Sequence, residues 1–597
     1  MTTNPPLTQA SHPGITSPLL PTGDGIMIPL PSPTPALPRS FLGWLPYLFG
    51  SVLFTGSPDP DRRVRWLSLT IVLLLPAAIL YPSRGFHLLE PDEGRYAQIP
   101  REMLQNGEWV VPTLQGEPYL DKPPLMYWLV ALSYRVLGVS PESARLVPAL
   151  CVHLTILAVY LLGRRSIGER ASFWAAVLLA VAPGYVSIAR LLLLDGLLVL
   201  CVTLSVLCGF EAVRAGRLKL GWWVAAAIAS GLGFLTKGPI SEVLLFVPLW
   251  AFGWLHRTQS ETRNAERGTR SDSECENVSG ESQATTSFPP GKVRWFHYAL
   301  FFAIVVAVNM PWYVAIYLRE PAFLKHFFWE HNVLRFVRPF DHLQPVWYYA
   351  PILLGGLLPG TILLAAYAWK LATGGPDSAA TRSPAGGFWL LAGGWCVFFF
   401  SCSGSKLPTY VLPAYPFLCL AVGEFVARSR WNTAIATRFA VCAMACLVLA
   451  VHHLGTPWYA RERSPFGRPE LVGRFVADPD TPVVCYPRNC DSLAFYAGRS
   501  DFEKVTTRAT NQLMVDCHHR PRTVILFTHR ESLAGFRNTL PPSLEIVETA
   551  NLRRGYGRSL LDLVFGSTPW GLCDVAVVTP KGQSGALGEH PGSARRR

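Results

Sequence analysis

The chain has 597 residues, and its composition excludes a soluble globular enzyme as well as a disordered or fibrous protein. Charged residues are only 16% of it, against about 25% in soluble domains, while apolar residues reach 50% and the mean hydropathy is +0.26. The net charge of +13 does not indicate nucleic acid as a partner, because basic clusters between apolar segments are typical of membrane proteins. The composition predicts an all-α polytopic membrane protein.

The first 60 residues are rich in Pro, Ser and Thr and are predicted to be a disordered tail with an interfacial segment at 41–56. Residues 61–455 then carry the membrane domain. Two pairs of apolar runs are closely joined, so we expect 11–13 membrane helices. The runs lie at 66–82, 144–162, 171–189, 191–213, 221–236, 238–256, 295–318, 346–369, 387–402, 407–427 and 436–454.

Basic residues assign the loops to two sides. By the positive-inside rule, the basic loops face the cytoplasm of a plasma membrane, and among them is a polar linker at 257–292. The outer side then receives two long loops, at 83–143 and 319–345, and most of the unusual polar residues. The basic loops are 62–65, 163–170, 214–219, 256–292, 370–382 and 428–438.

Residues 456–580 are predicted to form a small extracytoplasmic α/β domain, followed by a disordered tail at 581–597. Short apolar runs at 482–486, 523–528 and 574–579 are typical of buried strands. Its cysteines fit two alternatives equally well, disulfides of an oxidising compartment or free buried thiols. They are Cys485, Cys490, Cys517 and Cys573.

The first outer loop opens with three acids in four residues, Glu90, Asp92 and Glu93, followed by Arg95. Pro91 favours a helix start, and the two later acids suit the positive end of its dipole. Asp92 and Arg95 then share one face. A capped interfacial helix, with its apolar side on the bilayer, explains the pattern as well as a catalytic role does.

Farther along the same loop, Asp121 and Lys122 precede two prolines that hold the chain extended. A fixed ammonium at the interface suits a lipid-linked phosphate, although a lysine reaching toward headgroups explains it equally well. In the second long loop, His331 can give a nitrogen to a divalent cation, with an oxygen from Glu330 or Asp121. The alternative for this histidine is an ordinary interfacial hydrogen bond.

Further polar residues are predicted on the outer side. Arg335 suits phosphate oxygens, and Tyr410 can donate a hydrogen bond to phosphate. Asp195 and Lys237 each interrupt apolar sequence without a nearby partner in the sequence. Each signal alone is weak, but all of them fall on the side that the basic loops do not occupy.

Taken in order, seven motifs resemble the lipid A aminoarabinose transferases and their relatives, the protein O-mannosyltransferases, which are GT-C glycosyltransferases. The resemblance runs from about Leu89 to Gly423. The motifs are PDEGRYAQIPREML, YLDKPPLMYW, LLLLDG, FLTKGP, FFWEHNVLRF, QPVWYYAPILLGGLLPG and SKLPTYVLPAYP.

The resemblance implies a role for each candidate residue. Asp92 would be the catalytic-loop carboxylate, Arg95 its charge partner and Asp195 a second acid facing the cavity. The carrier phosphate would be held by Lys122, Arg335 and Tyr410. Asp121 and His331 would correspond to a divalent metal site, where the family usually has Glu in place of this Asp.

The implied function is sugar transfer, hexosyl or pentosyl, from a polyprenyl-phosphate donor to an envelope acceptor such as lipid A. Membrane lipids are further partners, and no nucleotide cofactor is expected, since no Gly-rich phosphate loop is present. Transfer to protein is the alternative within the class. A lipid or sugar transporter is the alternative outside it, although the chain shows no internal repeat.

Overall fold

The computed structural model describes residues 62–214, 216–269, 291, 293–334, 342–373, 383–463, 469–529, 532–552 and 574–582, and two short strands at 19–20 and 28–29. The chain divides into two compact units, Met1–Asp59 and Pro60–Arg597. In the first unit, β1 (Leu19–Leu20) pairs antiparallel with β2 (Ile28–Pro29). The predicted interfacial segment at 41–56 and the tail beyond 582 lie outside the described residues.

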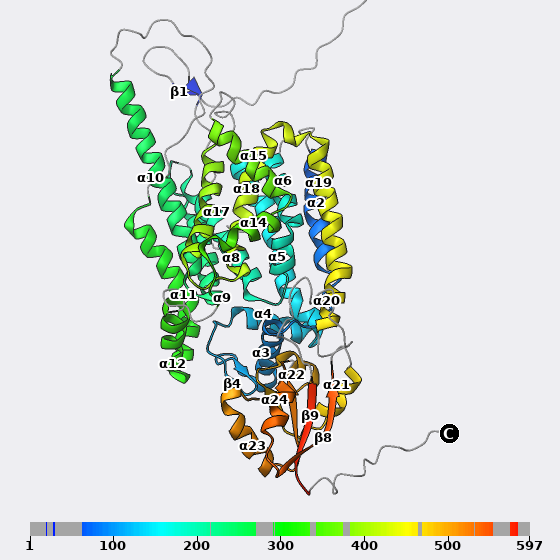
Figure 1. The fold of residues 1–597 in the computed structure, drawn as a ribbon. Coiled ribbons are helices and arrows are strands. Elements are labelled where there is room, and N and C mark those ends of the chain that lie inside the picture. The colour runs from blue at the N-terminus through cyan, green and yellow to red at the C-terminus, as the bar shows by residue number, and fades with distance from the viewer. Residues whose placement is uncertain are drawn as a thin grey trace, which may run out of the picture. The chain divides into compact units, whose positions relative to one another are not determined.

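Each predicted apolar run forms helix in the second unit (Figure 1). The membrane part consists of α2 (Arg62–Leu80), α5 (Pro141–Ile167), α6 (Glu169–Val181), α7 (Pro183–Ala189), α8 (Leu194–Val213), α9 (Leu220–Lys237), α10 (Ile240–Thr269), α11 (Trp295–Arg319), η3 (Val346–Tyr348), α14 (Tyr349–Gly356), α15 (Gly360–Thr373), α17 (Pro384–Cys402), η4 (Pro408–Val411), α18 (Ala414–Ala427), η5 (Arg430–Asn432), α19 (Ile435–Ala450), η6 (Val451–Gly455) and α20 (Thr456–Arg463).

Within the described residues, six helices are long and apolar enough to cross a membrane, or eight if each of two bent pairs is one span. The pairs bend by 61° between α6 and α7 and by 113° between η3–α14 and α15. Pro183 and Pro359 lie at these breaks, where a missing N–H interrupts helical hydrogen bonding. Four shorter apolar helices accompany them. The chain is a multi-pass membrane protein, as predicted.

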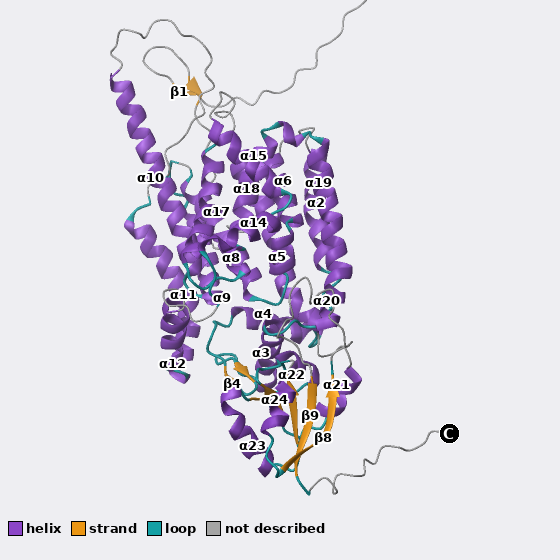
Figure 2. Cartoon of the chain, viewed as in Figure 1, coloured by secondary structure: helices purple, strands orange, loops and turns teal. Residues whose placement is uncertain are grey.

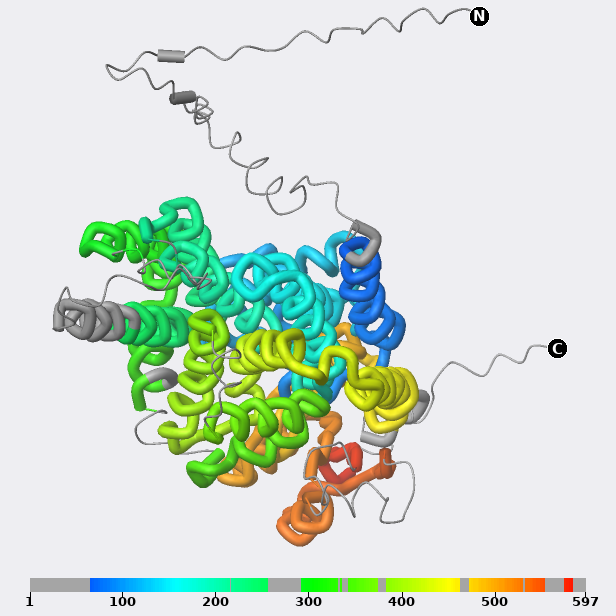
Figure 3. Tube along the Cα trace, turned by 90° about the horizontal axis from the view of Figure 1, so that it is seen from above, coloured from blue at the N-terminus to red at the C-terminus, as the bar shows by residue number. Residues whose placement is uncertain are grey.

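The helices pack around α18, which contacts α5, α6, α15 and α17, while α8 packs against α5 and α9. Large apolar side chains remain exposed on the outer helices, including Trp295 (80% exposed) and Ile435 (84%). Such exposure fits contact with lipid tails. Viewed along the helices, α2 and α19 lie side by side although they are far apart in the sequence (Figure 3).

The first long loop is a folded layer rather than an open loop. It holds α3 (Asp92–Asn106), the hairpin of β3 (Thr113–Leu114) and β4 (Glu117–Pro118), and α4 (Leu125–Leu137). The expectation that the apolar side of α3 lies on the bilayer is wrong, because Ile99 and Met103 are 0% and 1% exposed. They belong to a core cluster with residues of α4 and with Phe495. The second long loop forms α12 (Ala322–Leu324) and the π-helix η2 (Lys325–Leu334).

The C-terminal domain has a five-stranded sheet of order β6-β5-β7-β9-β8 (Figure 2). The three predicted strands are present, with β5 parallel to β6 and β7, and β9 antiparallel to β7 and β8. Two apolar cores flank the sheet. Its elements are α21 (Pro469–Val476), β5 (Val483–Tyr486), α22 (Asp491–Ala497), β6 (Glu503–Lys504), η8 (Thr507–Ala509), α23 (Thr510–His519), β7 (Thr523–Phe527), α24 (Ser532–Thr539), β8 (Leu544–Asn551) and β9 (Asp574–Pro580).

The structure differs from the sequence-based boundaries at two places. The last span continues past residue 455 as one helical segment, Ile435–Arg461. The predicted linker at 257–292 begins as helix, because α10 runs to Thr269. Of the two alternatives for the cysteines, free buried thiols are observed for Cys485, Cys490 and Cys517. Cys573 lies outside the described residues.

Candidate functional site

Asp92 and Arg95 lie in the first turn of α3, where Asp92 is its first residue. The Asp92 carboxylate and the Arg95 guanidinium are 3.8 Å apart, as their i,i+3 spacing predicts. The Asp92 side chain is 51% exposed, so it is open to a substrate.

Glu93 points the other way, into the protein, and fixes the start of α3. Its carboxylate contacts the Arg145 guanidinium at 2.6 Å, with both side chains 2% exposed or less. It also accepts the backbone N–H of Leu89 at 3.0 Å and that of Leu192 at 2.8 Å. Burial opposes its charge, but Arg145 holds the pKa of Glu93 below its ordinary value. Glu93 thereby joins the segment of Asp92 to the segment that leads into Asp195.

Tyr119 connects Arg95 to the second candidate motif. Arg95 donates to the Tyr119 hydroxyl at 3.4 Å, and its guanidinium lies 5.8 Å from the centre of the Tyr119 ring. Two residues later is Asp121, whose backbone carbonyl accepts from the Lys122 ammonium at 2.9 Å. The structure therefore brings Asp92, Arg95, Tyr119 and Asp121 into one continuous set of contacts, and Lys122 follows Asp121 directly in the chain.

His326 is a neighbour of Asp121 that the sequence reasoning missed. Its Nε2 is 3.1 Å from the Asp121 carboxylate and its Nδ1 is 2.7 Å from the Glu330 carboxylate. Burial lowers the pKa of His326, but the two carboxylates outweigh it and raise the pKa above its ordinary value. The motif FFWEHNVLRF had directed attention to His331, whose side chain lies outside the described part, as does Arg335.

Asp195 and Lys237, which have no partner nearby in the sequence, pair with each other at 2.7 Å. Asp195 is in the first turn of α8 and Lys237 is the last residue of α9, so two antiparallel neighbours bring them together. The Lys237 ammonium also lies 5.0 Å from the centre of the Tyr410 ring. The signal available in the sequence was that each charge ends an apolar run on the same predicted side.

Tyr96 links the two groups of contacts. Burial, Tyr119 and the negative charges of Asp92 and Asp195 raise the pKa of this phenol. Its ring also stacks on Tyr127 at 6.0 Å. Asp92 and Asp195, about a hundred residues apart in the chain, thus lie within electrostatic reach of one side chain.

The structure leaves the implied metal site untested, because the side chain of His331 lies outside the described residues. Both nitrogens of His326 are within hydrogen-bond distance of carboxylates. In the part of the chain that the structure describes, no group of three or more His, Cys, Asp or Glu residues is arranged to hold a metal ion. The metal on Asp121 and His331 stays a prediction.

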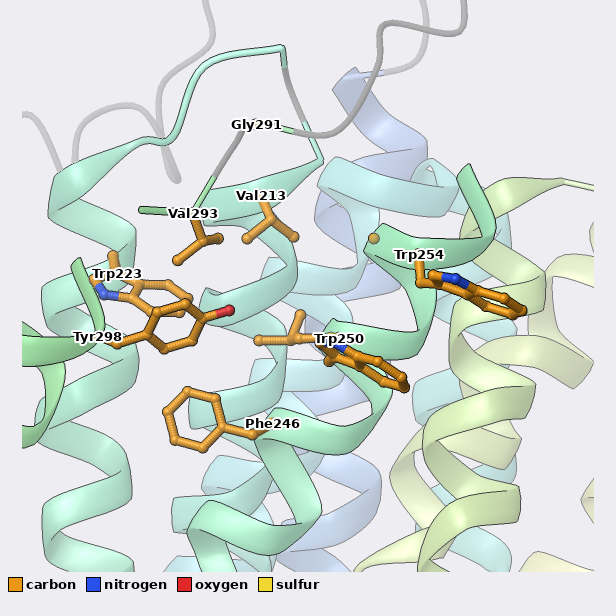
Figure 4. Close-up of a pocket in the computed structure, with 10 residues that line it drawn as sticks. Val213, Trp223, Phe246, Trp250, Trp254, Gly291, Val293 and Tyr298 are labelled. Carbon is orange, nitrogen blue, oxygen red and sulfur yellow. The ribbon is translucent and has the colours of Figure 1, made fainter. Parts of the chain in front are cut away.

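A cavity of about 110 Å³ lies elsewhere, between α8, α9, α10 and α11. Its wall includes the aromatic rings of Trp223, Phe246 and Tyr298 (Figure 4). Val213, at one end of α8, also lines the cavity, whereas Asp195 lies at the other end of the same helix. At a rise of 1.5 Å per residue, the two ends are about 27 Å apart. This cavity therefore has no part in the site around Asp92.

The Asp195–Lys237 pair predicts strong coupling between two substitutions. Lys237→Met leaves the Asp195 carboxylate, 10% exposed, without its 2.7 Å partner. We expect Lys237→Met to lower the melting temperature in detergent, and the added Asp195→Asn change to recover part of that loss, with a coupling of about 1–3 kcal/mol. Additive effects of the two single changes would contradict the pairing.

The chain is similar to known proteins over much of its length. The family of dolichyl-phosphate-mannose-protein mannosyltransferases matches residues 121–263. An undecaprenyl phosphate-α-4-amino-4-deoxy-L-arabinose arabinosyl transferase of Pseudomonas fluorescens is 29% identical over 433 residues, covering 70% of this chain and 66% of the relative. The corresponding transferase of Edwardsiella ictaluri is 30% identical over 426 residues, which cover 68% of each chain. The chain belongs to the aminoarabinose arabinosyl transferase family.

The fold of this arabinosyl transferase family member agrees with a solved relative. The crystal structure of ArnT from Cupriavidus metallidurans bound to undecaprenyl phosphate matches with a TM-score of 0.65 at 19% identity, covering 88% of this chain and 99% of that one. The likeness shows that the fold is shared. In the sequence comparison, this chain spans 66%, 59% and 60% of three curated arabinosyl transferases.

Proposed function

We propose that the chain transfers a pentose from a polyprenyl-phosphate donor to an envelope lipid such as lipid A. The observation that carries the proposal is the contact path that joins an open carboxylate, Asp92, through Arg95 and Tyr119 to Asp121, the residue directly before Lys122. Membership in the arabinosyl transferase family supports a polyprenyl-phosphate donor, and the names of the relatives support a pentose.

The proposed reaction replaces one bond to the anomeric carbon of the sugar by another. The bond from that carbon to the phosphate oxygen breaks, and its electron pair stays on the phosphate. Lys122 and Tyr410 stabilise the developing charge, and the predicted role of Arg335 is the same. These donors act on the transition state more strongly than on the ground state, which is the requirement for catalysis.

The acceptor oxygen forms the new bond to the anomeric carbon. If the acceptor is a hydroxyl, Asp92 takes its proton; if it is a phosphate, already ionised, Asp92 orients it. The Arg95 guanidinium lies 3.8 Å from the Asp92 carboxylate and orients it. Asp195 is proposed as a second acid facing the substrate, with Lys237 balancing its charge.

We also propose that the reaction occurs on the extracytoplasmic face of the plasma membrane. The basic loops predicted to be cytoplasmic support this orientation, since Asp92, Lys122, Asp195 and Tyr410 all belong to the opposite set of segments. A lipid-anchored donor in the outer leaflet reaches such a site without leaving the membrane.

The test uses purified protein in detergent with undecaprenyl-phosphate aminoarabinose and lipid A. We expect release of undecaprenyl phosphate and a matching mass increase in lipid A, both measured by mass spectrometry. A mannose-loaded carrier with a protein acceptor tests the second candidate, which the match to the mannosyltransferase family favours. Absence of carrier release with every donor and acceptor would reject transferase activity and favour a transporter.

A further inference from the structure

The C-terminal domain contacts the segment that leads into Asp92. From its helix α22, the Ser492 backbone N–H donates to the Glu90 carboxylate at 2.6 Å. The Tyr496 hydroxyl accepts the backbone N–H of Leu88 at 3.0 Å. Glu90 and Leu88 are two and four residues before Asp92, so the domain holds this segment by both its backbone and a side chain.

A second row of contacts holds the next turns of α3. Gln98 and Arg101 donate to the backbone carbonyl of Arg499 at 2.8 and 3.0 Å. Gln98 is 0% exposed and Arg101 is 6% exposed. Buried polar groups require such partners, so these turns of α3 depend on the C-terminal domain for hydrogen bonding. Both parts belong to the one compact unit Pro60–Arg597.

Gly94 shows how close the two backbones are. A Cβ atom at this position would lie 2.5 Å from the Ser492 backbone nitrogen and 2.7 Å from the Glu90 carboxylate. Such a distance leaves no room for any side chain at Gly94. Gly94 stands between Asp92 and Arg95, so a displacement of α22 changes the position of both charged residues.

The contact also buries two carboxyl groups, those of Glu90 and Asp491. Burial, and then the charge of Asp491, raise the pKa of Glu90 to about 8. Burial likewise raises the pKa of Asp491 to about 6, although Arg95 and a hydrogen bond from Gln115 oppose this. The other groups acting on the pair are Ser492, Glu102 and Lys504, and the Cys490 thiol lies 3.8 Å from Glu90. The docked interface therefore favours the protonated form of Glu90.

We propose that the C-terminal domain positions the catalytic segment through Glu90, which accepts the Ser492 N–H and thereby fixes Asp92 and Arg95. The inference rests on the proposed transferase function and assigns a task to residues outside the membrane helices. Glu90 acts through its bond to the Ser492 N–H and does not touch the substrate, so it is a positioning residue. Its loss affects the rate of transfer rather than the binding of the donor.

The first test compares Glu90→Ala with Glu90→Gln. Alanine leaves the Ser492 N–H buried without its acceptor, so we expect kcat to fall about tenfold or more. Glutamine keeps an oxygen acceptor, so kcat at pH 6 stays within about twofold of the wild type. The KM for the polyprenyl-phosphate donor is unchanged in both variants. Glu117→Gln, at an exposed carboxyl of the same layer, is the matched control.

The second readout is the dependence on pH. The pKa of Glu90 is higher in the docked state than its ordinary 4.5, so protonation of Glu90 stabilises the docked state at low pH. This stabilisation is lost as the pH rises through about 8. Glutamine cannot ionise. The ratio of wild-type kcat to Glu90→Gln kcat therefore falls between pH 6 and pH 9, by up to about 90-fold where docking limits the rate. A constant ratio would overturn the proposal, as would full activity of Glu90→Ala.

A milder variant tests the domain itself. Tyr496→Phe removes the acceptor of the Leu88 N–H, and we expect faster hydrogen exchange at residues 88–95 and a kcat about threefold lower. Tyr486→Phe, whose hydroxyl pairs with Thr510 inside the domain, leaves both unchanged. Unchanged exchange in Tyr496→Phe would overturn the proposal. If residues 88–95 exchange hydrogen more slowly in the wild type than in Tyr496→Phe but the wild type transfers no sugar, the positioning contact stands and the proposed function is rejected instead.

Discussion

Asp92→Asn is expected to lower the rate of sugar transfer by about 10²- to 10⁴-fold, the contribution of a positioned general base. Asparagine keeps the size of the side chain and its place in the first turn of α3, but it cannot take a proton. The cations proposed to hold the donor phosphate are unaffected, so the affinity for undecaprenyl phosphate stays the same. The measurement is carrier release under single-turnover conditions, beside a donor-binding isotherm.

Asp480→Asn is the matched control for this change, because Asp480 is an exposed carboxylate of the C-terminal domain. It should leave both transfer and donor binding unaltered. Full transfer activity in Asp92→Asn would remove the catalytic role of this carboxylate. A loss of donor affinity of the same size as the loss of rate would move Asp92 from chemistry to binding.

Arg145→Ala has the largest expected effect on stability. The Glu93–Arg145 pair is 2% exposed or less, and removal of one partner of a buried pair costs about 3–5 kcal/mol. Arg145 also donates to the backbone carbonyls of Arg84 and His87 at 2.7 and 3.1 Å, which would lose their donor. We expect a large fall in the melting temperature in detergent, with loss of transfer because Glu93 anchors the Asp92 segment.

An exposed ion pair is the natural comparison. Arg474 contacts Glu548 in the C-terminal domain, where the two side chains are 55% and 39% exposed. Arg474→Ala should cost about 1 kcal/mol or less, since water screens the pair. Equal losses of stability in Arg145→Ala and Arg474→Ala would contradict the assignment of Glu93–Arg145 as a buried anchor.

Local sequence patterns predicted much of the fold. Apolar runs of membrane length became helices, and the strand at 482–486 was found at Val483–Tyr486, because burial on both faces selects continuous apolar sequence. The i,i+3 pairing of Asp92 with Arg95 was also predictable, since it depends on helical geometry alone. These features need no knowledge of distant residues.

Features that depend on distant contacts were not predicted. The pairing of Asp195 with Lys237 joins residues 42 positions apart, and that of His326 with Asp121 joins residues 205 apart. A place on the bilayer remained one of two alternatives for the apolar side of α3, because its pattern cannot distinguish lipid from the C-terminal domain, which includes Phe495 in the same core. Helix α4, which begins directly after Pro124, was not among the predicted helices.

The contact between Gly94 and Ser492 constrains how hybrid enzymes can be assembled from relatives. A C-terminal domain transplanted from another species brings its own version of α22 but meets the α3 of the recipient. Because the two backbones approach without room for a side chain, the splice has to carry residues 88–115 together with the transplanted domain. Chimeras cut at the end of the last membrane helix would separate two surfaces that contact each other directly.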